Sequence, residues 1–357
     1  MFQTSFLLRN PHVQTLFATF FRKDKLEKVE TEEFILPDGD FVECVWQKEK
    51  PKDHRPIVVL FHGLAGSVNS PYIIGLMNAL DKQGFALVLM HFRGCGKKEN
   101  LKPRAYHSGE TGDAKAFIEH LQKTYPNNPL HAVGFSIGGN MLLKLLAEWG
   151  SDAPLHSAVS VSAPLSLDIC ADTIEKGFAR VYQNYLLTPL KATLLQKYKK
   201  FEMEKYIGSN EEEIKSLKTI RAFDDAYIAP MFGFNSSQDY YDQCSARQYL
   251  KDIKTRTLII HAKDDPFMTE EIIPNEEELS DFVMLELSEH GGHVGFVSGT
   301  LREPVYWLDE RVLEFLLKQN PINQKQEELK VLVGIAPKGS LKDLDMKSIR
   351  ASRALDE

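Results

Sequence analysis

Short, predominantly apolar runs recur along the middle of the chain. Runs of this length are typical of strands that are buried on both faces of a parallel sheet. Two further strands, Val29–Leu36 and Phe41–Gln47, are predicted on either side of the turn Pro37-Asp38-Gly39-Asp40. The later runs are Ile57–Phe61, Phe85–Met90, Leu130–Val133, Leu155–Val161, Thr257–His261 and Phe282–Leu287.

Helical patterns occupy nearly every gap between the later runs. Pro71–Lys82 and Gly112–Lys123 place apolar residues on one side, and Pro304–Lys318 is predicted to be a final amphipathic helix. Strands that alternate with helices form a mostly parallel sheet, because each crossover returns the chain to the same end of the sheet. The pattern therefore predicts an α/β fold with a mostly parallel, eight-stranded sheet and helices on both faces.

The pattern changes twice along the chain. Residues 165–249 are helical, polar and aromatic and lack a buried strand, so we interpret them as an inserted helical cap. Residues 321–357 are rich in Lys, Asp, Glu and Ser, and we predict that they form a flexible tail. Residues 1–320 then make up one α/β domain, which includes the N-terminal segment and carries the cap.

The first 21 residues are apolar only in patches. Arg9, Asn10 and Pro11 interrupt them, so the segment does not fit a signal peptide. No stretch reaches the roughly 18 uninterrupted apolar residues that a membrane span needs, so no transmembrane segment is predicted. The aromatic residues of this segment are expected to pack on the domain, and peripheral contact with a membrane is the alternative.

The composition is that of an ordinary globular protein. Of the 357 residues, 43% are hydrophobic and 26% are charged, and the net charge of −7 argues against a nucleic-acid partner. The four cysteines have no C-x-x-C spacing, so neither a zinc site nor a disulfide framework is predicted. A reducing cytoplasm is the simplest location for such a chain, and no cofactor is indicated.

One motif joins an apolar run to a helical pattern: Gly134-Phe135-Ser136-Ile137-Gly138. In a strand–turn–helix context, G-x-S-x-G presents a serine on a strained turn, and the helix directs its positive N-terminus toward the same point. The motif also occurs by chance, and a glycine-rich turn can bind phosphate. Neither G-x-x-x-x-G-K-S/T nor G-x-G-x-x-G is complete here, which favours a nucleophilic serine.

Three predicted strand ends carry residues that suit nucleophilic catalysis. Ser136 follows the fifth predicted strand and His293 follows the eighth. Asp264 and Asp265 follow the seventh. Ligands bind beyond the carboxyl ends of parallel strands, where an imidazole can take the serine proton and a carboxylate can orient the imidazole. The sequence therefore predicts a triad of Ser136, His293 and one of the two aspartates.

A tetrahedral intermediate needs hydrogen-bond donors for its negatively charged oxygen. The main-chain N–H of Ile137, directly after the serine, is one expected donor. The loop His62-Gly63-Leu64-Ala65-Gly66 follows the third predicted strand, and the N–H of Leu64 is the expected second donor. Losing one donor of this kind typically lowers the rate about a hundredfold or more.

Five motifs occur together and in a fixed order: His62-Gly63-Leu64-x-Gly66-Ser67, Phe92-Arg93-Gly94-Cys95-Gly96, Tyr106-His107-Ser108-Gly109-Glu110, the segment Gly134–Leu142 and Gly291-Gly292-His293-Val294-Gly295-Phe296. With Asn10-Pro11-His12-x-Gln14-Thr15 and Phe223-Asp224-Asp225 they resemble the YheT-like branch of the α/β-hydrolases. The resemblance covers about residues 5–318. It implies a serine hydrolase of carboxylic esters, with short- to medium-chain esters or acylglycerols as plausible substrates.

Two assignments, the acid and the base, each require a choice between two candidate residues. The α/β-hydrolase pattern places a small residue three positions before the acid, and Ala262 lies three positions before Asp265. This spacing favours Asp265 over Asp264. The glycines around His293 and its place in the motif favour it over His290 as the base.

Three other residues lie in loops after strands. His62, Arg93 and His107 could line the substrate pocket. A structural polar network is the favoured role of Arg93 and His107, and hydrogen bonding within its own loop is the favoured role of His62. The candidate histidines lack short ligand spacings such as H-x-H or H-x-x-x-H, so no metal site is predicted. The expected partner is a small-molecule or lipid ester. An acyltransferase with the same triad, or a binding protein that kept only the fold, is the alternative to a hydrolase.

Overall fold

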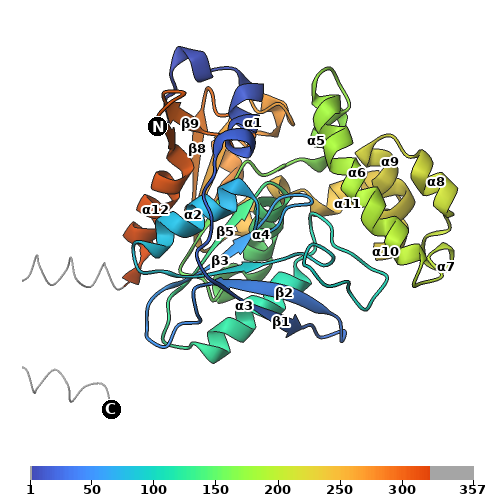
Figure 1. Ribbon diagram of the computed structural model, residues 1–357, viewed down its shortest axis with the longest axis horizontal. Coiled ribbons are helices and arrows are strands. Elements are labelled where there is room, and N and C mark those ends of the chain that lie inside the picture. The colour runs from blue at the N-terminus through green and yellow to red at the C-terminus, as the bar shows by residue number, and fades with distance from the viewer. Residues whose placement is uncertain (1, 322–357) are drawn as a thin grey trace, which may run out of the picture.

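The computed structural model describes residues 2–321, and their largest element is one eight-stranded sheet (Figure 1). Its order is β1-β2-β4-β3-β5-β6-β7-β8. β2 is antiparallel to β1 and β4, and every other pairing in this sheet is parallel, which confirms the predicted fold class. The strands are β1 (Val29–Ile35), β2 (Phe41–Gln47), β3 (Ile57–Phe61), β4 (Ala86–Met90), β5 (Leu130–Phe135), β6 (Ser157–Val161), β7 (Arg256–Ala262) and β8 (Val283–Ser288).

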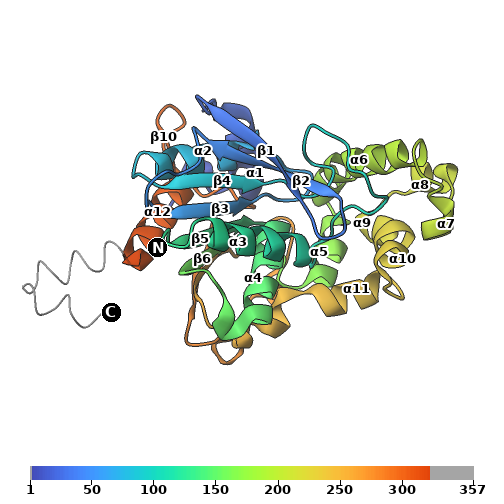
Figure 2. The ribbon, with the colours of Figure 1, turned by 90° about the horizontal axis from the view of Figure 1, so that it is seen from below.

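Helices cover both faces of the sheet (Figure 2). Successive side chains of a strand point to opposite faces, so a fully apolar strand supplies both apolar cores. On β3, Val58 and Leu60 belong to the core beneath α2 and α12. Ile57, Val59 and Phe61 belong to the opposite core, beneath α3 and α4. These helices are α2 (Pro71–Asp81), α3 (Gly112–Thr124), α4 (Ile137–Trp149) and α12 (Trp307–Gln319).

The chain between β6 and β7, all of which is described, contains helices and no strand. Most of these helices project beyond the sheet on the same side in both views (Figures 1 and 2). The predicted cap falls on this segment, and its division from the rest as a cap stays a prediction. The helices are α5 (Leu167–Ile174), α6 (Ala179–Tyr198), α7 (Glu204–Ile207), α8 (Glu211–Ser216), α9 (Ile220–Phe223), a π-helix (Asp224–Ile228), α10 (Ala229–Phe232), α11 (Ser237–Cys244) and a 3-10 helix (Ala246–Asp252).

The last predicted helix begins three residues later than expected. Pro304–Tyr306 form the short strand β10, which pairs with β9 (Val297–Gly299), and α12 begins only at Trp307. Proline is common in the first turn of a helix, so the local sequence favoured a helix start at Pro304. Pairing with a strand that precedes it by only a few residues overrides this preference. The predicted tail, apart from its first residue, lies outside the described residues.

The N-terminal segment forms a 3-10 turn (Phe6–Leu8) and the helix α1 (Pro11–Phe21), whose first N–H groups bond to the side chain of Asn10. The prediction that its aromatic residues pack on the domain is confirmed for Phe2 and Phe17, which are buried, and wrong for others. A short helix buries only one side, so Phe20 and Phe21 remain exposed, as does Phe6 in the turn.

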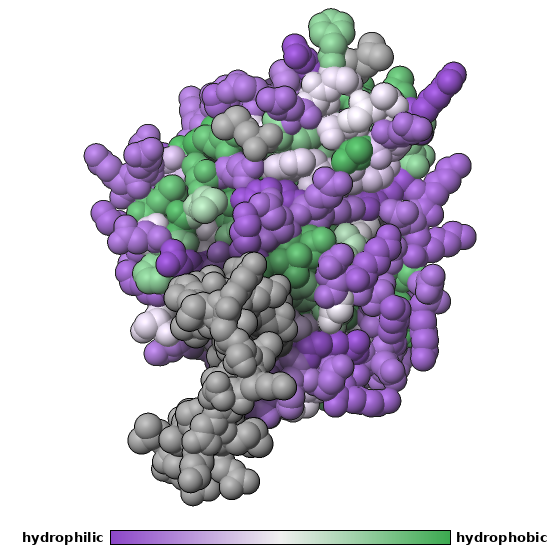
Figure 3. All heavy atoms as spheres, turned by 90° about the vertical axis from the view of Figure 1, so that its left-hand side faces the viewer, coloured by the Kyte–Doolittle hydropathy of each residue, from purple (hydrophilic) through white to green (hydrophobic). Residues whose placement is uncertain are grey.

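No helix in the described part of the chain is long and apolar enough to cross a membrane. On the face in Figure 3, apolar side chains lie in separate areas between hydrophilic ones. Peripheral contact with a membrane stays a prediction.

Candidate active site

Ser136 lies at the turn between β5 and α4, in a backbone conformation that few non-glycine residues adopt. Its φ is 52° and its ψ is −123°, and its N–H donates to the carbonyl of Val161 at 2.8 Å. A Cβ at Gly134 would overlap the carbonyl group of Gly138, and one at Gly138 would lie 2.6 Å from the carbonyl oxygen of His62. The two glycines therefore permit the close approach that places the serine at the apex of the turn.

The side chains of Ser136, His293 and Asp265 form one connected series. His293 Nε2 lies 3.1 Å from Ser136 Oγ, and His293 Nδ1 lies 2.8 Å from Asp265 Oδ2. Asp265 is only 4% exposed, and its other carboxylate oxygen accepts the N–H of Phe267 at 2.9 Å. A buried carboxylate with these partners can hold the proton of the imidazole on Nδ1, so that Nε2 faces the serine as an acceptor.

The neighbouring aspartate has different partners. Asp264 Oδ2 lies 3.2 Å from His290 Nδ1, and Asp264 Oδ1 accepts the N–H of Gly292 at 2.9 Å. Burial raises the pKa of Asp264 above its ordinary value. In the structure, Asp265 therefore contacts His293, and Asp264 contacts the loop that carries His290.

Residues distant in sequence hold the loop around His293. The N–H of His293 donates to Thr15 Oγ1 at 2.9 Å, and the N–H of Val294 donates to Ser162 Oγ at 3.1 Å. Val294 and Ser162 both have positive φ, of 60° and 50°. One hydrogen bond thus joins two strained residues and, with the bond to Thr15, holds the main chain of the loop that carries His293.

An aromatic ring covers the imidazole. The rings of Phe267 and His293 are stacked, with centroids 4.1 Å apart and planes at 10°. Phe267 also contacts the ring of Tyr182 on α6, at 5.0 Å between centroids. Phe267 therefore shields His293 and connects it to the inserted helices.

No role was predicted for Thr15, Ser162 or Phe267. Thr15 lies in one of the motifs that carried the resemblance, which was a usable signal. Phe267 is two residues from Asp265, and only the folded chain shows that its ring lies on His293.

The two expected oxyanion donors belong to segments next to the serine. Ile137 is the first residue of α4, and the loop that contains Leu64 passes so close that a Cβ at Gly63 would lie 3.3 Å from Ser136 Cβ. Within residues 2–321, neither the N–H of Leu64 nor that of Ile137 has a protein acceptor. Both groups are therefore available to an oxygen bound at Ser136, and their role as donors stays a prediction.

The three candidate pocket residues, His62, Arg93 and His107, contact other groups inside the protein. His62 Nδ1 lies 2.7 Å from the carbonyl of Gly63, and its Nε2 accepts the N–H of Phe92. Burial lowers the pKa of His62 to about 3, so its ring is neutral. Arg93 is 2% exposed and forms two hydrogen bonds with Asp113, at 2.6 and 2.7 Å.

His107 lies among the rings of Phe232, Phe234 and Tyr240, and burial lowers its pKa to about 3 as well. His62 contacts its own loop and Arg93 belongs to a buried polar network, while the contacts of His107 with these rings are aromatic. We therefore do not assign His62, Arg93 or His107 to the substrate pocket.

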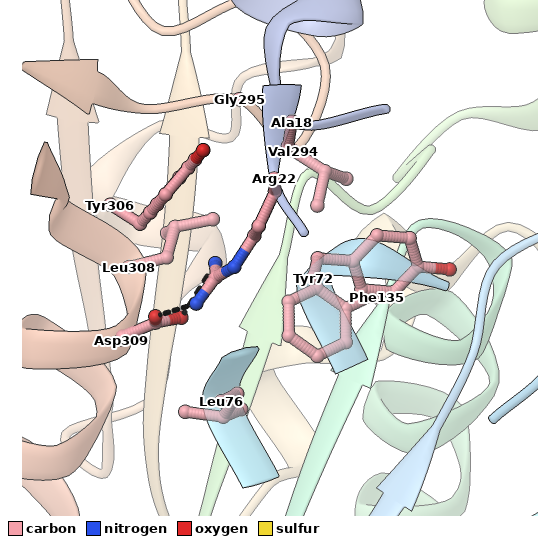
Figure 4. A pocket seen from close by; sticks show the side chains of 10 residues that line it. All are labelled: Ala18, Arg22, Tyr72, Leu76, Phe135, Val294, Gly295, Tyr306, Leu308 and Asp309. Carbon is pink, nitrogen blue, oxygen red and sulfur yellow. Dashed lines mark hydrogen bonds and ion pairs between the residues drawn. The ribbon is translucent and has the colours of Figure 1, made fainter. Parts of the chain in front are cut away.

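A small hollow lies beside the site rather than in it (Figure 4). Tyr72, Phe135 and Val294 line one side of it. Arg22 extends into the hollow and pairs with Asp309, as Figure 4 shows. The side chains of the proposed triad do not line this hollow, so we give it no role in binding substrate. Among residues 2–321, no group of three or more His, Cys, Asp or Glu side chains could hold a metal ion.

Comparisons with known proteins concern the family and the fold. Residues 56–300 match the family model described as alpha/beta hydrolase fold. The candidate esterase YheT of Escherichia coli (strain K12) is 47% identical over 311 residues, which are 86% of this chain and 90% of that protein. Phospholipase ABHD3 of Mus musculus is 28% identical over 85% of this chain and 75% of its own length.

A solved structure has the same fold at low sequence identity. The Pyrococcus furiosus esterase Pf2001 superposes with a TM-score of 0.52 at 17% identity, over 82% of this chain and 90% of that one. At this identity the similarity concerns the fold alone.

Proposed function

Because the chain belongs to the alpha/beta hydrolase fold family, in its YheT-like branch, we propose that it is a serine hydrolase that cleaves carboxylic esters through an acyl-enzyme. One observation carries the proposal: Ser136, His293 and Asp265 form a continuous series with separations of 3.1 and 2.8 Å. Two relatives named as a candidate esterase and a phospholipase support an ester as the bond that is cleaved.

Acylation begins when His293 takes the proton of Ser136. The serine oxygen attacks the ester carbonyl carbon, and the carbonyl oxygen becomes an anion that the N–H groups of Leu64 and Ile137 can bind. Asp265 stabilises the imidazolium that forms and keeps its orientation. When the carbon–oxygen bond breaks, His293 gives its proton to the leaving alcohol, and the acyl group remains on Ser136.

Deacylation repeats these steps with water in place of the serine. His293 removes a proton from the water, the hydroxide attacks the acyl carbonyl, and the same N–H groups bind the second oxyanion. Collapse of this intermediate returns the proton to Ser136 and releases the carboxylic acid. We propose a small-molecule or lipid ester, of the short- to medium-chain or acylglycerol type, as the substrate.

Labelling with a fluorophosphonate probe tests the nucleophile directly. The probe should modify the wild-type protein at Ser136, as located by mass spectrometry, and it should not label Ser136→Ala. Ser136→Ala should also lose hydrolysis of p-nitrophenyl esters of graded chain length while its thermal unfolding stays close to that of the wild type. Undiminished ester hydrolysis by Ser136→Ala would contradict the proposal, as would a lack of labelling in well-folded wild-type protein.

Product analysis separates hydrolysis from acyl transfer on the same triad. The proposal expects free carboxylic acid as the main product even when an alcohol such as ethanol or glycerol is added. A new ester as the main product under these conditions would reassign the protein as an acyltransferase.

A further inference from the structure

The loop after β3 is strained where it passes the nucleophile. Ala65 has a φ of 53°, a left-handed conformation that a residue with a side chain seldom adopts. Such a conformation persists only where surrounding contacts hold it. The partners of the N–H groups in this loop therefore determine where each of them points.

Two tyrosine hydroxyls accept the N–H groups on either side of Leu64. The N–H of Gly63 donates to the hydroxyl oxygen of Tyr72 at 2.9 Å. The N–H of Ala65 donates to the hydroxyl oxygen of Tyr106 at 3.0 Å. Among residues 2–321, no acceptor takes the N–H of Leu64, which lies between them.

The rest of the loop forms main-chain hydrogen bonds, so the N–H of Leu64 is not free because the whole loop lacks acceptors. The three N–H groups after Ala65 each have an acceptor within the protein. These bonds run from Gly66 to the carbonyl of Gly63 at 3.0 Å, from Ser67 to Ser70 Oγ at 3.1 Å and from Val68 to His91 Nε2 at 3.1 Å.

The two tyrosines lie in separate segments, Tyr72 on α2 and Tyr106 in the loop between β4 and α3. Tyr72 lies in the first turn of α2, and its ring contacts that of Phe135, the residue directly before Ser136, at 4.7 Å between centroids. Figure 4 shows the Tyr72 hydroxyl directed away from Arg22 and the hollow. Tyr106 stacks on Phe92, with centroids 4.9 Å apart. Burial raises the pKa of both tyrosines above the ordinary value, so both remain neutral phenols.

We propose that Tyr72 and Tyr106 are positioning residues for oxyanion stabilisation. By accepting the N–H groups of Gly63 and Ala65, they hold the strained loop in place and leave the N–H of Leu64 as the one directed to the substrate. This inference rests on the proposed ester hydrolysis. The hydroxyls contact the loop and not the reacting atoms, so their effect should grow as negative charge develops on the substrate oxygen.

The test compares Tyr72→Phe and Tyr106→Phe with a matched control. Each variant keeps the ring and removes one acceptor from a main-chain N–H. Tyr240→Phe makes the same change elsewhere, because the N–H of Ser108 donates to the buried Tyr240 hydroxyl at 2.9 Å. Circular dichroism and thermal unfolding establish which variants are folded, and since the two hydroxyls belong to separate segments of the chain, one folded variant is sufficient.

The measurement is kcat and KM on a p-nitrophenyl ester and on its thiono analogue, whose sulfur accepts hydrogen bonds weakly. Both loop variants should lose about tenfold or more in kcat on the oxo ester, with KM changed less than about twofold. The thiono ester should lose much less, so the oxo-to-thiono ratio of kcat should fall. Tyr240→Phe should keep the wild-type ratio.

Failure of this inference is distinct from failure of the proposed function. Absence of ester hydrolysis in the wild type, together with absence of labelling at Ser136, would remove the proposed function. An active wild type whose folded Tyr→Phe variants lose oxo and thiono activity equally, or lose no more than Tyr240→Phe, would overturn the positioning role alone.

Discussion

At the scale of single residues, two adjacent aspartates at the end of β7 have different tasks. Asp265 is buried and faces His293, while Asp264 accepts the N–H of Gly292 and faces the half-exposed His290. The side chains of adjacent residues point in different directions from an extended or turning backbone, so two adjacent aspartates can contact two different histidines. The partners, and not the residue type, distinguish the two carboxylates.

The two aspartates should therefore respond differently to the same change. Asp265→Asn should lower kcat about a thousandfold or more, because the amide can donate to Nδ1 and so favour the wrong tautomer of His293. Asp264→Asn should lower kcat less than about tenfold, since only the neighbouring loop loses a charged acceptor. Steady-state kinetics on one ester decides between them. The reverse ranking would transfer the role of the acid to Asp264.

The serine and histidine of the site could be proposed from local patterns. Ser136 lies in a five-residue motif between a strand and a helix, and His293 lies among glycines after a strand. The contributions of Thr15 and Ser162 could not, because each hydroxyl meets the His293 loop from a position more than a hundred residues away. No local periodicity carries information about such a contact.

At the scale of elements, one buried amide joins α4, the helix that follows Ser136, to the inserted helices. Asn140 on α4 is fully buried. Its Nδ2 donates to the carbonyls of Ser108 and Cys244 at 2.9 and 2.8 Å, and its Oδ1 accepts the N–H of Ala246 at 2.9 Å. One side chain thus bonds to three main-chain groups, one in the loop before α3 and two in the inserted segment.

Replacing this amide should destabilise the protein strongly. Asn140→Ala leaves two carbonyls and one N–H buried without partners, so the free energy of unfolding should fall by about 2–5 kcal/mol. Urea denaturation measures the change. Gln238→Ala, which removes two exposed bonds, one to Asp242 on α11 and one from Arg221, is the control and should change stability by about 0.5 kcal/mol or less. Equal effects in the two variants would show that Asn140 does not join these elements.

Most element types, though not all their ends, were predictable. Runs such as Ile57–Phe61 were correct to the residue because full burial makes every position apolar. The start of α12 was wrong because Pro304–Tyr306 pair with β9, and this pairing depends on a tight turn that the hydrophobic pattern does not show.

At the scale of the whole molecule, burial keeps several ionisable groups neutral. Burial lowers the pKa of His62, His107 and His131 to about 3, and raises that of Asp224 to about 7. The ordinary values are 6.5 for histidine and 3.8 for aspartate. Unfolding would return all four groups to water, so the stability of the fold depends on pH.

Acid should therefore destabilise the protein well above the pH at which most carboxylates titrate. Between pH 6.5 and 5, the unfolded chain binds protons at the three histidines that the folded state excludes, whereas Asp224 binds its proton only in the folded state and offsets part of this. Since the unfolded state binds more protons overall, the free energy of unfolding should fall as pH falls, by on the order of 2 kcal/mol per pH unit.

Urea denaturation at pH 7.5, 6.5, 5.5 and 5.0 measures this slope. His131→Asn removes one of the titrating groups at a position outside the proposed site, and its slope should be smaller by about one proton, roughly 1.4 kcal/mol per pH unit. A stability that does not change over this range would show that these rings are not kept neutral by the fold.

The amino-acid sequence by itself determined the layered α/β architecture, the turn that carries Ser136 and the chain order of serine, acid and base. These features follow from burial and backbone sterics, which act between near neighbours and leave a period or a motif in the chain. The spacing to Ala262 favoured Asp265 over Asp264, and the structure places Asp265 beside His293. The tertiary structure alone decided that Tyr72 and Tyr106 leave one N–H of the intervening loop free. Such pairings require atoms of separate elements to lie within about 3 Å, and that precision arises only when the whole core is packed.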